Sequence, residues 1–201
     1  MSPLTFIFMG RSGCGKGVQA KNLQKYIEGR DADKRSVVYV ETGSRFRAFV
    51  ASQSHAAALA REINDNKGLQ PEFLAIWNWA GALIDTLHGG EHIIFDGIMR
   101  RLDEAKVFVG AMKFFKREKP VVIHLNVSRA FSEKLMRGRA RGDDDEEGIK
   151  RRLDWYDTEV EPVISHLKSE KPFSFVEING EQTIEEVRVE IIAKLEKEGI
   201  V

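Results

Sequence analysis

Five short apolar runs constrain the fold of this chain more than any other feature. They cover residues 4–9, 36–40, 92–95, 121–127 and 173–178. Runs of this length suit buried strands, and the longer segments between them mix polar and apolar residues as helices do. Strands that alternate with helices predict an α/β fold, in which helices cover both faces of a parallel five-stranded sheet.

Helix signals lie in the segments between these runs. Residues 17–27 have a helical pattern, Ser128 is placed to cap a helix over 129–137, and Pro71 is placed to open a helix that runs to about residue 87. Thr183 and Glu186 have the spacing of a capping box before a further helix. The segments between strands therefore predict helices with defined starts.

Composition limits the class of partner. The 201 residues are enough for one domain with a large core, and 31 basic residues balance 31 acidic ones. A chain without net charge has no long-range field to hold nucleic acid or an anionic membrane. The single cysteine and the absence of a run of about 18 apolar residues favour an intracellular protein. We expect a cytoplasmic monomer that binds neither nucleic acid nor membrane.

The segment GRSGCGK, Gly10 to Lys16, fits the pattern G-x-x-x-x-G-K between a predicted strand and a predicted helix. Glycines let backbone amides approach a polyphosphate, and the helix N-terminus adds partial positive charge. The alternative is an ordinary glycine-rich turn. Gly17 follows Lys16 where a metal-contacting Ser or Thr is usual, so Mg²⁺ would be held by phosphates, waters and a carboxylate elsewhere.

Asp96 is the candidate for that carboxylate. It directly follows the apolar run 92–95, at the edge where ligands of parallel sheets bind. The alternative for Asp96-Gly97 is a turn with a solvated side chain.

Four arginines lie beside glycine-bearing or acidic motifs: Arg47, Arg100, Arg141 and Arg152. Phosphoryl transfer depends on positioning and on positive charge around the migrating group, and the planar guanidinium suits that task. For each arginine alone, a solvated surface position is the alternative. The charged segment around Arg141 is either an exposed loop or a lid that excludes water from bound phosphates.

Together these motifs resemble the adenylate kinase family over nearly the full length. GRSGCGKGVQ is similar to G-x-x-G-x-GKGTQ, ETGSRFR to STGDLLR, and DGIMRRLDEA to DGFPRTxxQA. RGDDDEEGIKRRL is similar to R-x-DD-x-EE-x-x-x-x-RL, and EPVISHL with EINGEQTIEEV resembles the C-terminal loop and last helix.

The resemblance implies a P-loop NTPase fold, a three-layer α/β/α sandwich, as a single domain over 1–201. Its core would be 1–41, 72–136 and 146–201, with a helical insertion for the nucleoside monophosphate at 42–71 and a short lid at 137–145. The lid lacks a cysteine quartet, so no structural zinc is expected.

The resemblance also implies roles for individual residues. The ATP site would comprise Gly13, Cys14, Gly15, Lys16, Gly17, Val18, Asn179, Gly180 and a lid arginine, either Arg137 or Arg139. The acceptor site would comprise Thr42, Arg47, Gln70, Gly97, Arg100, Glu104, Arg141 and Arg152. Lys16, Arg100, Arg141 and Arg152 would be catalytic, and Asp96 would order the waters of Mg²⁺.

Two departures bear on the acceptor base. Glu104 stands where the family has a glutamine that pairs with the base, and Gln70 stands where it has valine. An ionised carboxylate only accepts hydrogen bonds, whereas an amide also donates. The resemblance implies reversible transfer from Mg-ATP to AMP. The alternatives are a kinase for GMP, CMP or UMP, and a catalytically weak nucleotide-binding protein.

Overall fold

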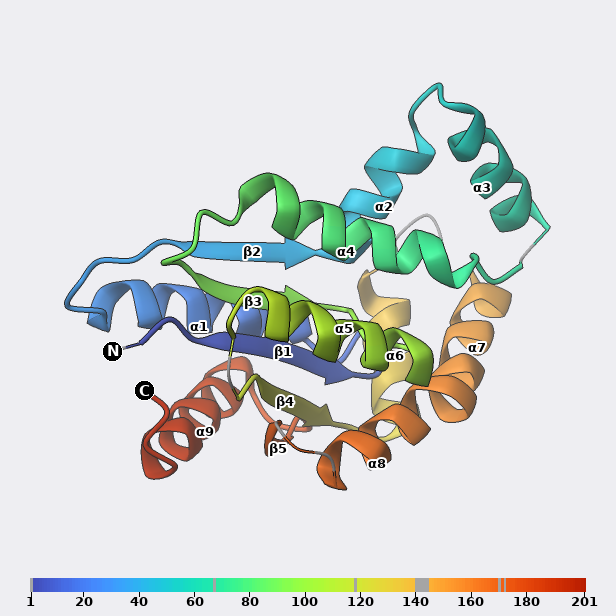
Figure 1. Ribbon diagram of the computed structural model, residues 1–201. Coiled ribbons are helices and arrows are strands. Elements are labelled where there is room, and N and C mark those ends of the chain that lie inside the picture. The colour runs from blue at the N-terminus through green and yellow to red at the C-terminus, as the bar shows by residue number, and fades with distance from the viewer. Residues whose placement is uncertain (1, 67, 118, 140–144, 170, 172) are drawn as a thin grey trace.

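A parallel five-stranded sheet runs through the part of the chain described by the computed structural model, which covers residues 2–66, 68–117, 119–139, 145–169, 171 and 173–201 (Figure 1). The strands are β1 (Thr5–Gly10), β2 (Val37–Glu41), β3 (His92–Asp96), β4 (Val121–Asn126) and β5 (Ser174–Asn179). Their order in the sheet is β2-β3-β1-β4-β5, and all four neighbouring pairs are parallel. The predicted α/β fold is confirmed, with strand boundaries shifted by one residue at most sites.

Alternate residues of the central strand β1 enter different cores. Ile7 and Met9 belong to a cluster with side chains of the helices α4 (Glu72–Thr86), α5 (Leu102–Phe114) and α8 (Glu161–Ser169). Phe6 and Phe8 pack in a second cluster with side chains of α1 (Lys16–Arg30) and α9 (Ile184–Lys197). All four side chains are at most 2% exposed. The strand is apolar on both faces because helices cover both faces, as parallel sheets require.

Ten helical segments lie in the described part of the chain. They are α1 (Lys16–Arg30), α2 (Thr42–Val50), α3 (His55–Asp65), α4 (Glu72–Thr86), α5 (Leu102–Phe114), α6 (Arg129–Arg139), α7 (Glu146–Trp155), the π-helical turn η1 (Tyr156–Val160), α8 (Glu161–Ser169) and α9 (Ile184–Lys197). None of these described helices is long and apolar enough to span a membrane.

The predicted helix starts match their caps. Ser128 accepts a hydrogen bond from the backbone of Phe131, and Thr183 forms a full capping box with Glu186. Pro71 is the N-cap of α4. Local hydrogen bonds of this kind depend on a few neighbouring residues, and a sequence pattern can therefore predict them.

Two helices lie within the range of the predicted insertion, 42–71, and rise from the carboxyl edge of the sheet, while the insertion itself stays a prediction. Helix α2 begins at Thr42, directly after β2, and α3 follows before α4 (Figure 1). The predicted lid, 137–145, begins within the end of α6, and its residues 140–144 are outside the described residues. The π-helical turn η1 was not predicted, because its sequence continues the pattern of the flanking helices.

Candidate active site

Predicted site residues follow the carboxyl ends of four strands. The glycine-rich loop leaves β1 at Gly10, Gly97 follows β3, and Gly180 follows β5. Thr42 follows β2. Because the strands are parallel, these loops meet at one edge of the sheet.

The glycine-rich loop is closed by its own lysine. Gly13 and Gly15 have φ angles of 85° and 92°, which favour glycine. Lys16 Nζ donates to the carbonyl oxygens of Gly10 at 2.8 Å and Arg11 at 2.7 Å. The ammonium group therefore lies at the mouth of the loop, beside the N-terminus of α1, where anion oxygens could replace these carbonyls. Cys14 is buried, 5% exposed, within the same loop.

Asp96 faces the first turn of α1. A Cβ added to Gly17 would lie 3.1 Å from Asp96 Oδ2, so the glycine permits this close approach. The hydroxyl of Tyr39 donates to the same carboxylate oxygen at 3.3 Å. Burial raises the pKa of Tyr39, and the negative charge of Asp96 adds to the effect. Tyr39 was missed at the sequence level because a tyrosine inside a strand carries no motif.

This arrangement fits an Mg²⁺ ion that arrives with ATP. In the described residues, no group of three or more His, Cys, Asp or Glu side chains converges as a metal site. Asp96 offers a hard carboxylate oxygen beside the phosphate loop, which suits a metal held mainly by phosphates and water.

Thr42, Gly97 and Arg100 form a second cluster beside the phosphate loop. Thr42 Oγ1 donates to the carbonyl oxygens of Asp96 at 3.2 Å and Gly97 at 2.9 Å. Arg100 Nε donates to Gly97 O at 3.0 Å. Gly97 has a φ of 87°, which favours glycine, and an added Cβ would lie 3.1 Å from Thr42 Oγ1.

Three of the predicted arginines lie on the described elements around this cluster. Arg100 Cζ lies 5.5 Å from the centre of the Trp155 ring. Burial lowers the pKa of Arg100 and the charge of Arg152 adds to this, whereas Glu104 and Asp96 oppose it. Arg152 projects from α7, where its Nε donates to Gly148 O at 3.2 Å. Arg47 lies on α2, its side chain is 57% exposed, and its Nη2 is 3.6 Å from Glu41 Oε1.

The residues expected near the acceptor base are engaged by the protein itself. Glu104 is 3% exposed, and its Oε2 accepts from the backbone N–H of Arg100 at 2.8 Å. Burial raises the pKa of Glu104, although backbone hydrogen bonds from Arg100 and Met99 oppose this. Gln70 Nε2 donates to the Ala60 carbonyl at 2.8 Å, which fastens the end of the insertion to α3.

The predicted lid arginines are described only in part. Arg137 pairs with Glu133 at 2.8 Å and with Glu146 at 3.1 Å, across α6 and α7. The side chain of Arg139 and the whole of Arg141 lie outside the described residues. The choice between Arg137 and Arg139 stays a prediction.

The loop after β5 packs closely on the loop after β4. Gly180 N donates to Asn126 O at 2.9 Å, and an added Cβ would lie 2.6 Å from Val127 Cγ1. Asn179 Oδ1 accepts from the backbone of Glu181 at 3.0 Å. Val18 lies on the exposed side of α1, with 45% of its surface accessible.

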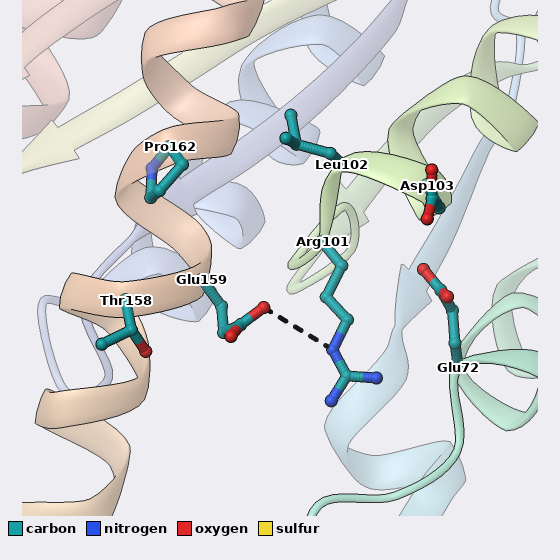
Figure 2. Close-up of a pocket in the computed structure, with 7 residues that line it drawn as sticks. All are labelled: Glu72, Arg101, Leu102, Asp103, Thr158, Glu159 and Pro162. Atoms are coloured by element: carbon teal, nitrogen blue, oxygen red, sulfur yellow. Dashed lines mark ion pairs between the residues drawn. The ribbon is translucent and has the colours of Figure 1, made fainter.

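A small pocket lies beside the Arg100 loop, between α5, the start of α4 and η1 (Figure 2). Arg101 extends into it, with Nε 3.9 Å from Glu159 Oε2. Figure 2 shows the guanidinium between the carboxylates of Glu159 and Glu72. Arg101 therefore ties the acceptor-side loop to η1.

Comparison with known proteins agrees with this geometry. The family model described as adenylate kinase matches residues 8–172. A protein named adenylate kinase from Leptospira biflexa is 30% identical over 195 residues, which cover 94% of this chain and 98% of that protein. Another from Phocaeicola vulgatus is 27% identical over 198 residues, which cover 96% and 99% respectively. Since the family match spans most of the sequence and these relatives align from end to end, the chain belongs to the adenylate kinase family.

Proposed function

We propose that the protein catalyses reversible phosphoryl transfer from Mg-ATP to AMP, which gives two molecules of ADP. Membership of the family makes the chain a nucleoside monophosphate kinase, and AMP as the acceptor is the finer proposal. The observation that carries it is the pairing of two sites at one sheet edge, the Lys16 loop and the cluster of Thr42, Gly97 and Arg100.

On the donor side, the loop amides, the start of α1 and Lys16 would bind the ATP phosphates. Mg²⁺ would neutralise part of the phosphate charge, and Asp96 would order its waters. The carbonyl oxygens that now accept from Lys16 would give way to phosphate oxygens as the nucleotide enters. This exchange keeps the ammonium group hydrogen-bonded in both states.

On the acceptor side, Arg100 would hold the phosphate of the monophosphate, with Thr42 and Arg47 beside it. Arg152, and Arg141 from the lid, would offset the charge that develops on the migrating phosphoryl group. Burial lowers the pKa of Arg100 and the positive charge of Arg152 adds to this, although Glu104 and Asp96 oppose it. An anion bound beside Arg100 would offset both effects, which supports a phosphoryl group at this point.

Transfer would be direct and in line, without a covalent enzyme intermediate, because positioned charge is sufficient for this reaction. Closure of the predicted lid, 137–145, would exclude water as a competing acceptor. We also propose that the protein is cytoplasmic and that it works as a monomer. Light scattering of the purified protein would test whether it is a monomer.

Glu104 is the reason to test the acceptor base directly. Its side chain is buried, and one carboxylate oxygen already accepts a hydrogen bond from the loop backbone. Burial raises its pKa, although backbone hydrogen bonds from Arg100 and Met99 oppose this. The support for AMP comes from the family and its named relatives, and not from this residue.

The test is a coupled assay of ADP formation with Mg-ATP and AMP, GMP, CMP or UMP in turn. We expect the highest kcat/KM with AMP. Background turnover with AMP, together with clear turnover of another monophosphate, would refute the AMP assignment while keeping the kinase.

A matched pair of variants tests the donor site. Lys16→Met should lower kcat at least about 100-fold, in the range found when one transition-state donor is removed. Lys21→Met removes the same group from the exposed side of the same helix and should leave the rate unchanged. Full activity of both variants would show that Lys16 does not act on the phosphates and would overturn the proposed donor site.

A further inference from the structure

Arg11 occupies the first variable position of the phosphate loop and points away from its mouth. Its Nε donates to Val127 O at 3.2 Å, and its Nη1 forms an ion pair with Asp157 of η1. Its guanidinium carbon lies 4.2 Å from the centre of the Tyr156 ring. The side chain is only 16% exposed. Arg11 therefore joins the loop to Val127, directly after β4, and to the π-helical turn.

The two residues of η1 that Arg11 contacts, Tyr156 and Asp157, are held in place by further interactions. Tyr156 is 5% exposed, and its hydroxyl lies 3.1 Å from His124 Nε2 in β4. Asp157 also accepts from Arg129 Nη1 at 2.8 Å, and Arg129 Nη2 lies 2.6 Å from Asp154 Oδ1. Arg11 would lose a stacked ring, an ion pair and a carbonyl contact together if it turned toward the phosphates, so its present position is favoured.

The turn η1 receives an arginine from each of the two substrate loops. Arg11 reaches it from the phosphate loop, and Arg101 reaches Glu159 from the loop that carries Arg100 (Figure 2). The preceding helix, α7, carries Arg152, and its last residue, Trp155, lies beneath Arg100. The short turn η1 thus contacts the phosphate loop and the loop that carries Arg100, and it directly follows the helix that carries Arg152.

We infer that Arg11 is a positioning residue, which fastens the phosphate loop to η1 and so sets Arg152 at the correct distance from the donor phosphates. The inference rests on the proposed kinase function. Phosphoryl transfer is sensitive to displacements of about 1 Å between reacting groups, so loss of this link should affect the transfer step more than substrate binding.

The experiment compares Arg11→Ala, Asp157→Asn, the double variant and Arg30→Ala. Arg30 is a matched control at a distance, because it pairs with Glu196 at 2.8 Å and lies 5.3 Å from the Tyr26 ring, between α1 and α9. We expect kcat to fall about tenfold to 100-fold in both single variants, with the KM for AMP unchanged. The double variant should lose no more than either single one, as coupled partners do. Arg30→Ala should keep the wild-type kcat.

A second readout does not depend on activity. Hydrogen exchange should rise in Arg11→Ala and Asp157→Asn at both the phosphate loop and η1, and in Arg30→Ala at neither. If Arg11→Ala does not fold, Asp157→Asn and Arg11→Lys carry the test, and Arg11→Lys should recover only part of kcat because an ammonium group lacks the planar fork.

Three results would overturn the inference. A raised KM for ATP in Arg11→Ala, with normal kinetics in Asp157→Asn, would mean that Arg11 contacts the nucleotide directly. A lowered Tm with unchanged kcat in both variants would mean that the link only stabilises the fold. Unchanged hydrogen exchange at η1 would mean that the link does not hold the turn. A wild-type protein inactive with every monophosphate would instead refute the proposed function, and hydrogen exchange would still decide whether Arg11 fastens the loop to η1.

Discussion

Replacing Gly13 by alanine should destabilise the protein more than the same change at Gly15, although both glycines have similar φ angles of 85° and 92°. An added Cβ at Gly13 would lie 2.7 Å from Met136 Cγ and 3.2 Å from Ser132 O, whereas at Gly15 it would meet nothing within 4 Å. Both changes incur the cost of positive φ, about 1–2 kcal/mol. Only Gly13→Ala adds overpacking, at about 1–3 kcal/mol, because Met136 is fully buried and cannot move aside.

The expected loss is therefore about 2–5 kcal/mol for Gly13→Ala and about 1–2 kcal/mol for Gly15→Ala. For a domain of this size, 1 kcal/mol shifts Tm by roughly 2–4 °C, so Gly13→Ala should lower Tm by roughly 10 °C. Thermal unfolding without nucleotide measures both shifts, with urea unfolding as a check. Equal Tm values for the two variants would show that the contact between the loop and α6 does not constrain Gly13.

Further expectations concern pH, a helix cap and the metal. Burial lowers the pKa of His92 although Asp31 opposes this, so the unfolded chain binds a proton at this histidine at a higher pH than the folded protein does. The free energy of unfolding should therefore fall as the pH drops below about 6.5. In His92→Asn, urea titrations should show a weaker dependence of the free energy of unfolding on pH in this range, and an equal dependence would contradict the argument. Thr183→Ala should lower the free energy of unfolding by about 1 kcal/mol in urea, since it removes the side-chain cap of α9, and an unchanged value would contradict the capping box. Asp96→Asn should raise the Mg²⁺ concentration for half-maximal rate about tenfold in a magnesium titration, and an unchanged requirement would remove Asp96 from the metal site.

The fold was predictable because its signals are local. Each strand is a short apolar run that lies between glycines or polar segments. Helix caps such as Ser128 and Thr183 bond to groups within four residues of themselves, so a short stretch of sequence is enough to predict them. The turn η1 was not predictable, since a π-helical turn is selected by contacts such as the pair of Arg11 with Asp157, whose partners are 146 residues apart. No local pattern encodes such a contact.

The candidate site was predictable where a motif carries it. The loop with Lys16 and the cluster of Thr42, Gly97 and Arg100 lie as the motifs suggested, although their roles remain predictions. The sequence did not reveal that Glu104 bonds to the backbone of its own loop, because an acidic residue in the first turn of a helix has the same pattern whether its side chain faces a ligand or turns back. Burial distinguishes the two cases, and burial depends on the whole fold.

The sheet order has a consequence for synthesis on the ribosome. The phosphate loop emerges before the segments that support it: its strand pairs with residues 93–96 and 121–125, and Arg11 and Ser12 bond to Val127, Ser132 and Asp157, at separations of 116, 120 and 146 residues. A nascent chain that stops before these partners emerge contains the whole glycine-rich motif but lacks the residues that hold the loop in place. Bound nucleotide therefore cannot stabilise the loop before these partners emerge, and competence to bind it should arise only after Asp157 has left the exit tunnel.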